Sequence, residues 1–103
     1  MLQNIEIIGN LVADAELKTG KDGREYVAFR VAVSDNGGEE KRTTYYDVTF
    51  MKSGLQAYLK KGKYVYVSGR FSVSAVCKED KAYLNAYVSA RDIVLLRGGS
   101  SEG

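Results

Sequence analysis

The chain has 103 residues, and its 15 lysines and arginines exceed its 13 aspartates and glutamates, which gives a formal net charge of +2. This length is that of one domain, and a composition of 45% hydrophobic and 27% charged residues excludes a disordered chain. Because there is no histidine and a single cysteine, Cys77, the composition also excludes imidazole catalysis, an intramolecular disulfide and zinc cages built from histidines or several cysteines.

Residues 1–34 predict two strands. Apolar residues between positions 5 and 12 predict the first strand, and Gly9 followed by Asn10 predicts a bend or bulge inside it. The polar segment 18–24 contains two glycines and predicts a hairpin loop. The second strand shows a strict alternation of hydrophobic residues. We assign to its core face Val27, Phe29, Val31 and Val33, and to its opposite face Tyr26, Ala28, Arg30 and Ala32.

A polar loop is predicted at residues 35–42, before a third strand at residues 43–51. This strand also alternates, so we expect one face in the core and the other at the surface. The core face holds Tyr46, Val48 and Phe50, and the surface face holds Tyr45, Asp47, Thr49 and Met51.

The hydrophobic period changes at residues 53–62, which predict one short helix. Leu55, Tyr58 and Leu59 follow the i, i+3, i+4 spacing of a helical face. Ser53 is the predicted N-cap residue, and Gly62 is the predicted stop after two lysines.

Residues 64–76 and 83–96 predict two further strands joined by a turn at residues 78–81, and residues 98–103 predict a flexible tail. Five strands with one helix between the third and the fourth is the element order of the OB-fold, which binds oligonucleotides or oligosaccharides. We therefore predict an all-β protein: a five-stranded OB-fold Greek-key barrel with one short helix between strands 3 and 4, formed by residues 1–97.

Positive charge is concentrated in one part of the chain. Residues 48–78 carry six lysines and arginines and no acidic residue, whereas residues 1–36 carry a net charge of −2. Such a stretch forms either the footprint of a polyanionic partner or a solvated surface whose counter-charges come from elsewhere in the fold. The charges alone leave both interpretations open.

Several segments resemble, in the right order, the bacterial single-stranded DNA-binding protein family. They are Ile7-Ile-Gly-Asn-Leu11 followed by Asp14-Ala-Glu-Leu-Lys18, then residues 27–34, then Tyr58-Leu-Lys-Lys-Gly-Lys-Tyr-Val-Tyr-Val-Ser-Gly-Arg70, and finally residues 90–96. The resemblance covers residues 3–96. It implies an OB-fold protein that binds single-stranded DNA without sequence specificity, and that coats and protects it in replication, repair and recombination.

The resemblance also implies a protein without enzymatic activity, cofactor or metal. We expect a bacterial cytoplasmic protein associated with the nucleoid, and the start of the sequence agrees, since it has neither the basic segment nor the long apolar run of a signal peptide.

The chain departs from the family in its aromatic residues. The family stacks bases on tryptophans and a phenylalanine, and this chain has no tryptophan. The family's tryptophan at the start of its third strand corresponds to Tyr45, its aromatic near the end of that strand to Met51, and its hairpin tryptophan to a position near Val76. Only Tyr45 keeps a ring.

The predicted DNA-binding residues supply flat surfaces and positive charge, which are the two features that a single strand needs. Tyr45 is predicted to stack a base, with cross-strand packing as its alternative role. Met51 packs either against a base or within a protein interface. The full predicted set is Tyr45, Met51, Lys52, Lys61, Arg42, Arg30 and Tyr26.

Among the cations, Lys52 and Lys61 are predicted to contact phosphates. Lys60 is better explained by its position at the end of the helix, where a positive charge stabilises the last carbonyls. Arg30 either reaches DNA or pairs with Asp47 across the sheet. Arg42 either clamps the DNA strand or offsets the acidic residues of the loop before it.

Three further residues predict a homo-oligomer, either a tetramer or a dimer. Tyr64 and Tyr66 alternate with two valines, so both tyrosines are expected in an apolar patch outside the core. Ile8 has no core-facing role in the first strand. We expect these residues to be buried between subunits, as the resemblance also implies for this segment.

Two other functions stay open. An OB-fold that binds RNA or acts as a replication-restart adaptor has the same architecture, and relative affinities for single-stranded DNA, single-stranded RNA and duplex distinguish it. An enzyme has little support, since no nucleophile lies beside a base and no glycine-rich phosphate loop precedes Lys-Ser/Thr. We therefore predict no catalytic residue, no metal, no small-molecule substrate and no membrane partner.

Overall fold

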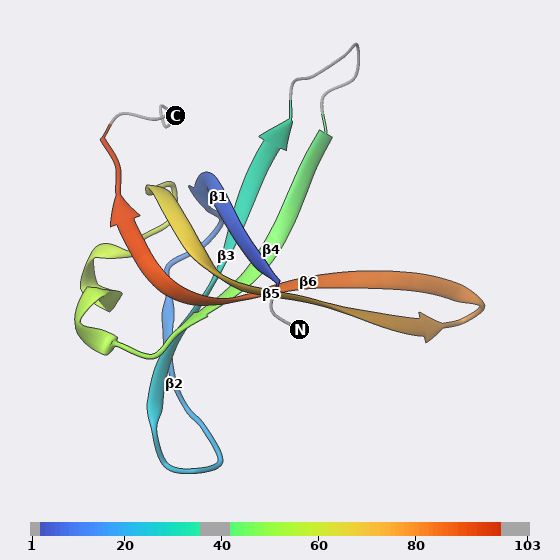
Figure 1. Ribbon diagram of the computed structural model, residues 1–103, viewed down its shortest axis with the longest axis horizontal. Coiled ribbons are helices and arrows are strands. Elements are labelled where there is room, and N and C mark those ends of the chain that lie inside the picture. The colour runs from blue at the N-terminus through green and yellow to red at the C-terminus, as the bar shows by residue number, and fades with distance from the viewer. Residues whose placement is uncertain (1–2, 36–41, 98–103) are drawn as a thin grey trace.

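The computed structural model describes residues 3–35 and 42–97, which form six strands and one short helix (Figure 1). They are β1 (Asn4–Leu11), β2 (Glu16–Thr19), β3 (Glu25–Asp35), β4 (Arg42–Phe50), η1 (Ser53–Tyr58), β5 (Tyr64–Lys78) and β6 (Lys81–Leu95). The all-β class is confirmed, and the helix lies between β4 and β5, which correspond to the third and fourth predicted strands. Most of the predicted loop at 35–42 and the predicted tail at 98–103 lie outside the described residues.

The strands close into a ring because β1 pairs with two different neighbours. The strand order in the sheet is β1-β5-β6-β4-β3-β2, and the end of β1 also pairs with β3. Asn10 is the point of change, since it lies opposite Tyr64 of β5 and Ala32 of β3. The bend predicted at Gly9 and Asn10 coincides with this change. Gly9 lies so close to β3 that a side chain there would overlap the Ala32 carbonyl oxygen.

The core lies inside the ring and is filled by alternate residues of its strands. Val27, Phe29 and Val31 of β3 and Val48 and Phe50 of β4 are buried, which confirms the predicted inner faces of these two strands. The remaining core residues are Ile7, Leu11, Ala15, Leu59, Val65, Val67 and Val88, while Val33 and Tyr46 are partly buried against them. Burial of these mostly aliphatic side chains is the main stabilising contribution to the fold.

The structure corrects the prediction around residues 16–19. These residues form the short strand β2, which pairs with β3, so the hairpin loop begins at Gly20 rather than at Lys18. All four residues of β2 are exposed. A strand with no buried face has no hydrophobic alternation, and the sequence therefore carries no signal for it.

The helix between β4 and β5 also differs from the prediction. It is a 3₁₀-helix that ends at Tyr58, and its N-cap position is occupied by Lys52 instead of Ser53, without a side-chain capping bond. Leu55 and Leu59 pack against the core as expected. Tyr58, which the i, i+3 spacing places on the same face, is 61% exposed instead.

Hydrogen bonds to the end of β1 explain why the helix stops early. The backbone N–H of Ala15 donates to the Leu59 carbonyl at 2.8 Å, and the N–H of Gly62 donates to the Leu11 carbonyl at 2.8 Å. These bonds hold residues 59–63 against the end of β1, where further helical turns would otherwise form. Gly62, the predicted stop, lies in this turn at a φ of 88°, which glycine adopts without strain.

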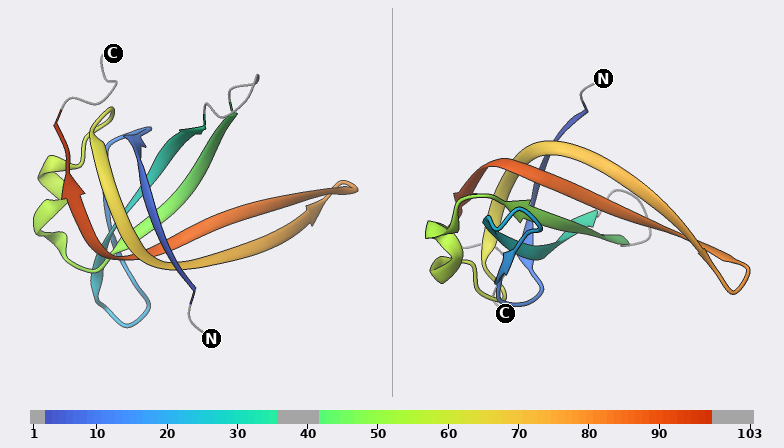
Figure 2. Two further views of the ribbon diagram at one scale, coloured as in Figure 1. Left: turned by 45° about the horizontal axis from the view of Figure 1, so that its top comes forward. Right: turned by 90° about the horizontal axis from the view of Figure 1, so that it is seen from below.

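The last two strands form a long arm that projects from the ring (Figures 1 and 2). Each strand has 15 residues. β5 ends at residue 78 instead of the predicted 76, and β6 begins at residue 81 instead of the predicted 83. Glu79 and Asp80 connect them with φ values of 51° and 65°, as in a two-residue type I′ hairpin turn. The predicted turn at 78–81 is confirmed. Within residues 3–35 and 42–97, no helix has the length and hydrophobicity needed to span a membrane.

The close approach of Gly9 to β3 yields a stability prediction. Replacing Gly9 with alanine places a methyl group against the Ala32 carbonyl and the Val31 side chain. We expect this overpacking to lower the free energy of unfolding by about 1–3 kcal/mol, measured by urea denaturation. Gly54→Ala is the matched control, because nothing lies within 4 Å of its added methyl group. Its effect should stay within about 0.5 kcal/mol, and equal losses in both variants would contradict the role given to Gly9.

Candidate nucleic-acid interface

The outer face of β3 and β4 carries the polar and aromatic residues that alternate with the core. Arg30 lies opposite Asp47, Ala32 opposite Tyr45, and Ala28 opposite Thr49. Tyr45 is 52% exposed, so its ring is available to a ligand. The surface assignment of these two strands is therefore confirmed.

An ion pair occupies the centre of this face. The Nε of Arg30 donates a hydrogen bond of 2.8 Å to Oδ1 of Asp47, and this bond, together with the negative charge of Asp47, raises the pKa of Arg30. The structure thus shows the pair with Asp47, which is one of the two possibilities left open for Arg30. The Nη atoms of Arg30 have no hydrogen-bond partner among residues 3–35 and 42–97, so the same guanidinium can still donate to a phosphate.

A third strand contributes Tyr87, which the sequence analysis missed. In the parallel pairing of β4 with β6, Tyr87 lies opposite Asp47, so the row across the face is Arg30, Asp47, Tyr87. Tyr87 is 39% exposed, whereas the next residue, Val88, is buried. The alternation of Ala86, Tyr87 and Val88 is the sequence signal that would have placed this ring at the surface.

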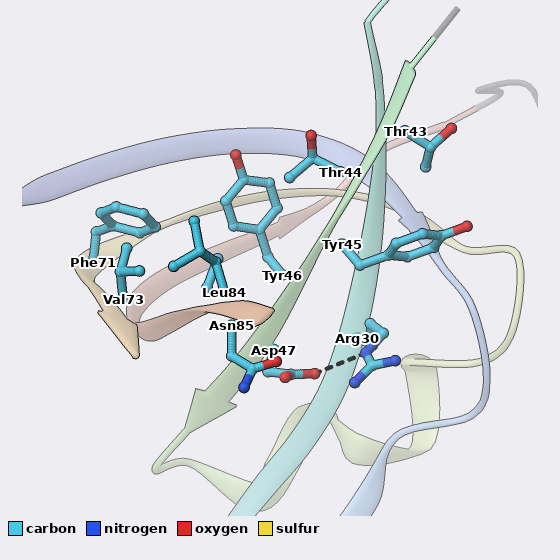
Figure 3. A pocket seen from close by; sticks show the side chains of 11 residues that line it. Arg30, Thr43, Thr44, Tyr45, Tyr46, Asp47, Phe71, Val73, Leu84 and Asn85 are labelled. Atoms are coloured by element: carbon cyan, nitrogen blue, oxygen red, sulfur yellow. Dashed lines mark hydrogen bonds and ion pairs between the residues drawn. The ribbon is translucent and has the colours of Figure 1, made fainter. Parts of the chain in front are cut away.

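A notch opens where β6 leaves β4. Their pairing begins at Tyr46 and Ala86; on the side of the arm tip, the two strands diverge and leave a cavity of about 530 Å³ (Figure 3). It is lined by Arg30, Thr43, Thr44, Tyr45, Tyr46, Asp47, Phe71, Val73, Leu84, Asn85 and Ala86. The rings of Tyr46 and Phe71 pack at a centroid distance of 6.4 Å. We call this cavity the notch.

The arm supplies the apolar wall of the notch, and the sequence analysis missed this wall. Val73 is 52% exposed and Leu84 is 74% exposed, although both are aliphatic. Alternation alone places them in a strand, but only the divergence of β6 from β4 explains why they face a cavity rather than the core.

A second cavity lies on the same face, on the side of β2. It measures about 500 Å³ and is lined by Val12, Ala13, Asp14, Glu16, Lys18, Tyr26, Ala28, Phe29, Arg30, Asp47, Val48, Thr49 and Tyr87. We call it the β2 cavity. It contains Tyr26 and Tyr87, whereas the third tyrosine of the outer face, Tyr45, lines the notch. Both cavities are lined by Arg30 and Asp47. The ion pair therefore separates two adjoining cavities.

The structure brings only part of the predicted set together. Tyr45, Arg30 and Tyr26 line the two cavities, whereas Met51, Lys52 and Lys61 line neither. Met51 and Lys52 are exposed just after the end of β4. The backbone of Arg42 pairs with Asp35, and the Arg42 side chain lies outside the described part of the structure.

The lysines after η1 lie beside Asp14. The backbone N–H of Lys61 donates to Oδ1 of Asp14 at 2.8 Å, and the Nζ of Lys60 lies 4.0 Å from Oδ2 of the same residue. The ammonium of Lys60 therefore has a carboxylate partner at the surface, while the Lys61 side chain is exposed.

The residues predicted for an oligomer interface lie on a different part of the ring, on β1 and β5. Ile8 lies opposite Tyr66, and Tyr66 lies opposite Val94 of β6. Ile8 and Val94 are 47% and 48% exposed. Tyr64 and Tyr66 point away from the buried valines beside them, as predicted, but both are partly buried within the chain itself. Among the strands described, residues 4–9 of β1 pair with β5 only.

No metal site is found in the described ranges, since they contain no group of three or more cysteines, aspartates or glutamates that could hold an ion. Cys77 is exposed on the arm and forms no disulfide.

Comparison with known proteins identifies relatives of this chain. A single-stranded DNA-binding protein of Rhizobium meliloti is 32% identical over 79 residues, which cover 67% of this chain and 45% of that protein. Single-stranded DNA-binding protein 1 of Xylella fastidiosa is 30% identical over 106 residues, which cover 92% of this chain and 77% of that protein. The chain thus spans less than half of the first relative and about three quarters of the second.

The fold is that of a solved OB-fold structure. The small single-stranded DNA-binding protein of Streptomyces coelicolor superposes with a TM-score of 0.78 at 21% identity, over 94% of this chain and 96% of that one. The model of the single-strand binding protein family matches residues 2–96, which is nearly the whole sequence. The chain therefore belongs to the single-strand binding protein family.

Proposed function

We propose that this protein binds single-stranded DNA without a defined recognition sequence, and that it coats and protects exposed strands in replication, repair and recombination. Family membership supports this function. The outer face of β3, β4 and β6 assigns this function to particular residues. Two cavities with exposed tyrosines adjoin one another there, and both are lined by Arg30. The names of the bacterial relatives, which are single-stranded DNA-binding proteins, support the same function. A protein without enzymatic activity, located in the cytoplasm with the nucleoid, is part of this proposal.

The two cavities suit unstacked bases. A base is flat and apolar on both faces, and Tyr45 offers a ring at the notch while Tyr26 and Tyr87 offer rings in the β2 cavity. Val73 and Leu84 supply an aliphatic surface on the other side of the notch. A base that enters the notch therefore exchanges water for apolar contacts on both faces.

Arg30 is placed to bind the backbone between these bases. It lines both cavities, and its Nε is occupied by Asp47 while its Nη atoms have no hydrogen-bond partner among the described residues. We therefore assign to Arg30 the phosphate that joins a base in the notch to a base in the β2 cavity. Lys52 and Lys61 lie outside the two cavities and would contact phosphates that flank the one bound by Arg30. A lysine ammonium attracts a phosphate by its charge and imposes no fixed hydrogen-bond geometry.

We further propose that the protein forms a homo-oligomer through β1 and β5. The row Ile8, Tyr66, Val94 is an apolar patch, and residues 4–9 of β1 offer a strand edge beside it. Two copies related by a twofold axis can pair these edges and bury the patches against each other. This surface is separate from the two cavities, so assembly leaves the DNA-binding face open.

The first prediction concerns Tyr45. Replacing Tyr45 with alanine removes a stacking surface and leaves the charge unchanged. We expect the affinity for oligo-dT to fall by about 1–3 kcal/mol, with little change in the slope of log K against log salt. Fluorescence titration at several salt concentrations measures both quantities. Tyr45→Phe keeps the ring and should bind nearly as well as the parent. If Tyr45 is only a cross-strand partner, the alanine variant will lose thermal stability and keep its affinity.

The lysine contacts have a different signature. Replacing Lys52 or Lys61 with alanine removes one cation, so each variant should flatten the slope of log K against log salt by about 0.7 for single strands. Lys60→Ala is the neighbouring control, because the Lys60 ammonium already lies beside Asp14. A slope that is the same in all three variants and the parent would show that these lysines do not contact phosphates.

Sedimentation tests the proposed interface. At micromolar concentration the parent chain should sediment as a multiple of its 11.3 kDa mass. Replacing Ile8 with glutamate places a charge in the patch and should shift the protein toward the monomer. Leu17→Glu is the matched control, since Leu17 is a similarly exposed aliphatic residue on β2, outside the patch. A parent that sediments only as the monomer would exclude this interface.

A further inference from the structure

We propose that Asp47 gives the notch a preference for bases that carry an exocyclic amino group, namely cytosine, adenine and guanine, over thymine. This inference rests on the proposed binding of single-stranded DNA and adds a specificity-determining residue to it. The preference acts at one base position, so it does not require a recognition sequence.

The notch has the shape and lining of a base-binding site. On the side of β4 it is lined by Tyr45 and Tyr46, whose rings lie on opposite sides of that strand, and on the side of the arm by Val73 and Leu84, and its volume is about 530 Å³. Apolar surfaces of this kind contact the faces of a base and cannot distinguish one base from another. Discrimination must come from the polar groups that meet the edge of the base.

Asp47 is the one negatively charged residue that lines the notch within the described ranges. It lies on β4, next to β6, whereas its partner Arg30 lies on β3, one strand further from the arm. The carboxylate is therefore nearer to the wall formed by the arm, and the guanidinium is nearer to the β2 cavity. Figure 3 shows the two groups joined by their hydrogen bond at the edge of the notch.

The bond to Arg30 fixes the carboxylate and leaves it able to accept more. Within the described residues, the hydrogen bond at 2.8 Å from Arg30 Nε to Oδ1 is the only one that Asp47 accepts. Oδ2 and the remaining lone pair of Oδ1 are therefore available to a ligand. Arg30 already holds the Asp47 side chain in place. A base that donates a hydrogen bond to this carboxylate therefore loses little binding free energy to ordering the side chain.

An ionised carboxylate can accept hydrogen bonds and cannot donate them. Cytosine N4, adenine N6 and guanine N2 are amino donors, and a carboxylate accepting from cytosine N4 is a known pairing in protein–DNA recognition. Thymine offers two carbonyl oxygens and a single ring N–H. A thymine carbonyl directed at Asp47 would place two acceptors against each other, and that contact is repulsive.

If Asp47 only orients Arg30 toward a phosphate, its replacement will affect all bases equally, because the phosphate is the same for each. If Asp47 meets the edge of the base, its replacement will change the ratio between bases. The ratio of dissociation constants for oligo-dT and oligo-dC is therefore the decisive measurement. Intrinsic differences between the two polymers cancel when this ratio is compared between variants.

The experiment is a fluorescence titration of the full chain with oligo-dT and oligo-dC of equal length. Compared with the parent, Asp47→Ala should lower the dT-to-dC ratio of dissociation constants about fivefold to tenfold, and Asp47→Asn should lower it further, because its amide N–H groups can donate to thymine O4. Glu25→Gln is the charge-matched control, since Glu25 is exposed on β3 and lines neither cavity. It should leave the ratio unchanged.

A modified oligonucleotide tests the same contact in the parent protein, without relying on the folding of a variant. Replacing cytosine with 2-pyrimidinone removes the 4-amino group and keeps the ring, so the parent should bind this strand about fivefold to tenfold more weakly than oligo-dC. Two results would each overturn the inference. One is a dT-to-dC ratio that stays the same in the Asp47 variants, and the other is a parent that binds the 2-pyrimidinone strand as tightly as oligo-dC. A parent that binds no oligonucleotide at all would overturn the proposed function itself.

Discussion

The pairing of β1 with both β5 and β3 is the constraint on which the rest of the structure depends. It closes the ring, and closure separates an inner face, where Val27, Val31, Val65 and Val67 are fully buried, from an outer face that solvent reaches. The pleat of a strand then directs every second residue to one of these faces. Without closure, the apolar residues of β3 and β4 would have no enclosed space to fill, and the tyrosines of the outer face would have no fixed positions.

The proposed DNA-binding face follows from the same alternation. The residues next to the buried valines in β3 and β4 are Arg30 and Asp47, and the parallel pairing with β6 adds Tyr87 to their row. Where the resemblance implies tryptophans, this chain presents tyrosines from three strands and an aliphatic wall from the arm. The apolar patch of Ile8 and Tyr66 lies on β1 and β5, so the proposed assembly and the proposed binding use different surfaces.

Much of this arrangement was predictable because it depends on local alternation. The strict pattern of Val27, Phe29 and Val31 located β3 and its buried face, and the family resemblance pointed to Tyr45. The strand β2 was not predictable, since all its residues are exposed and only its pairing with β3 holds it. The early end of η1 depends on hydrogen bonds to residues 11–15, more than 40 positions away in the chain. The notch depends on where β6 separates from β4, and no pattern within either strand records that position.

The arm gives the notch two walls of unequal stiffness. The wall that carries Tyr45 belongs to β4, which is paired with β3 and anchored on the core. The wall that carries Val73 and Leu84 belongs to the outer part of a two-stranded ribbon, whose strands pair there only with each other. Two-stranded ribbons twist and bend more easily than wider sheets. The gap between the walls is therefore adjustable, and in the proposed binding mode the arm can close onto a base after that base has entered the notch from solvent.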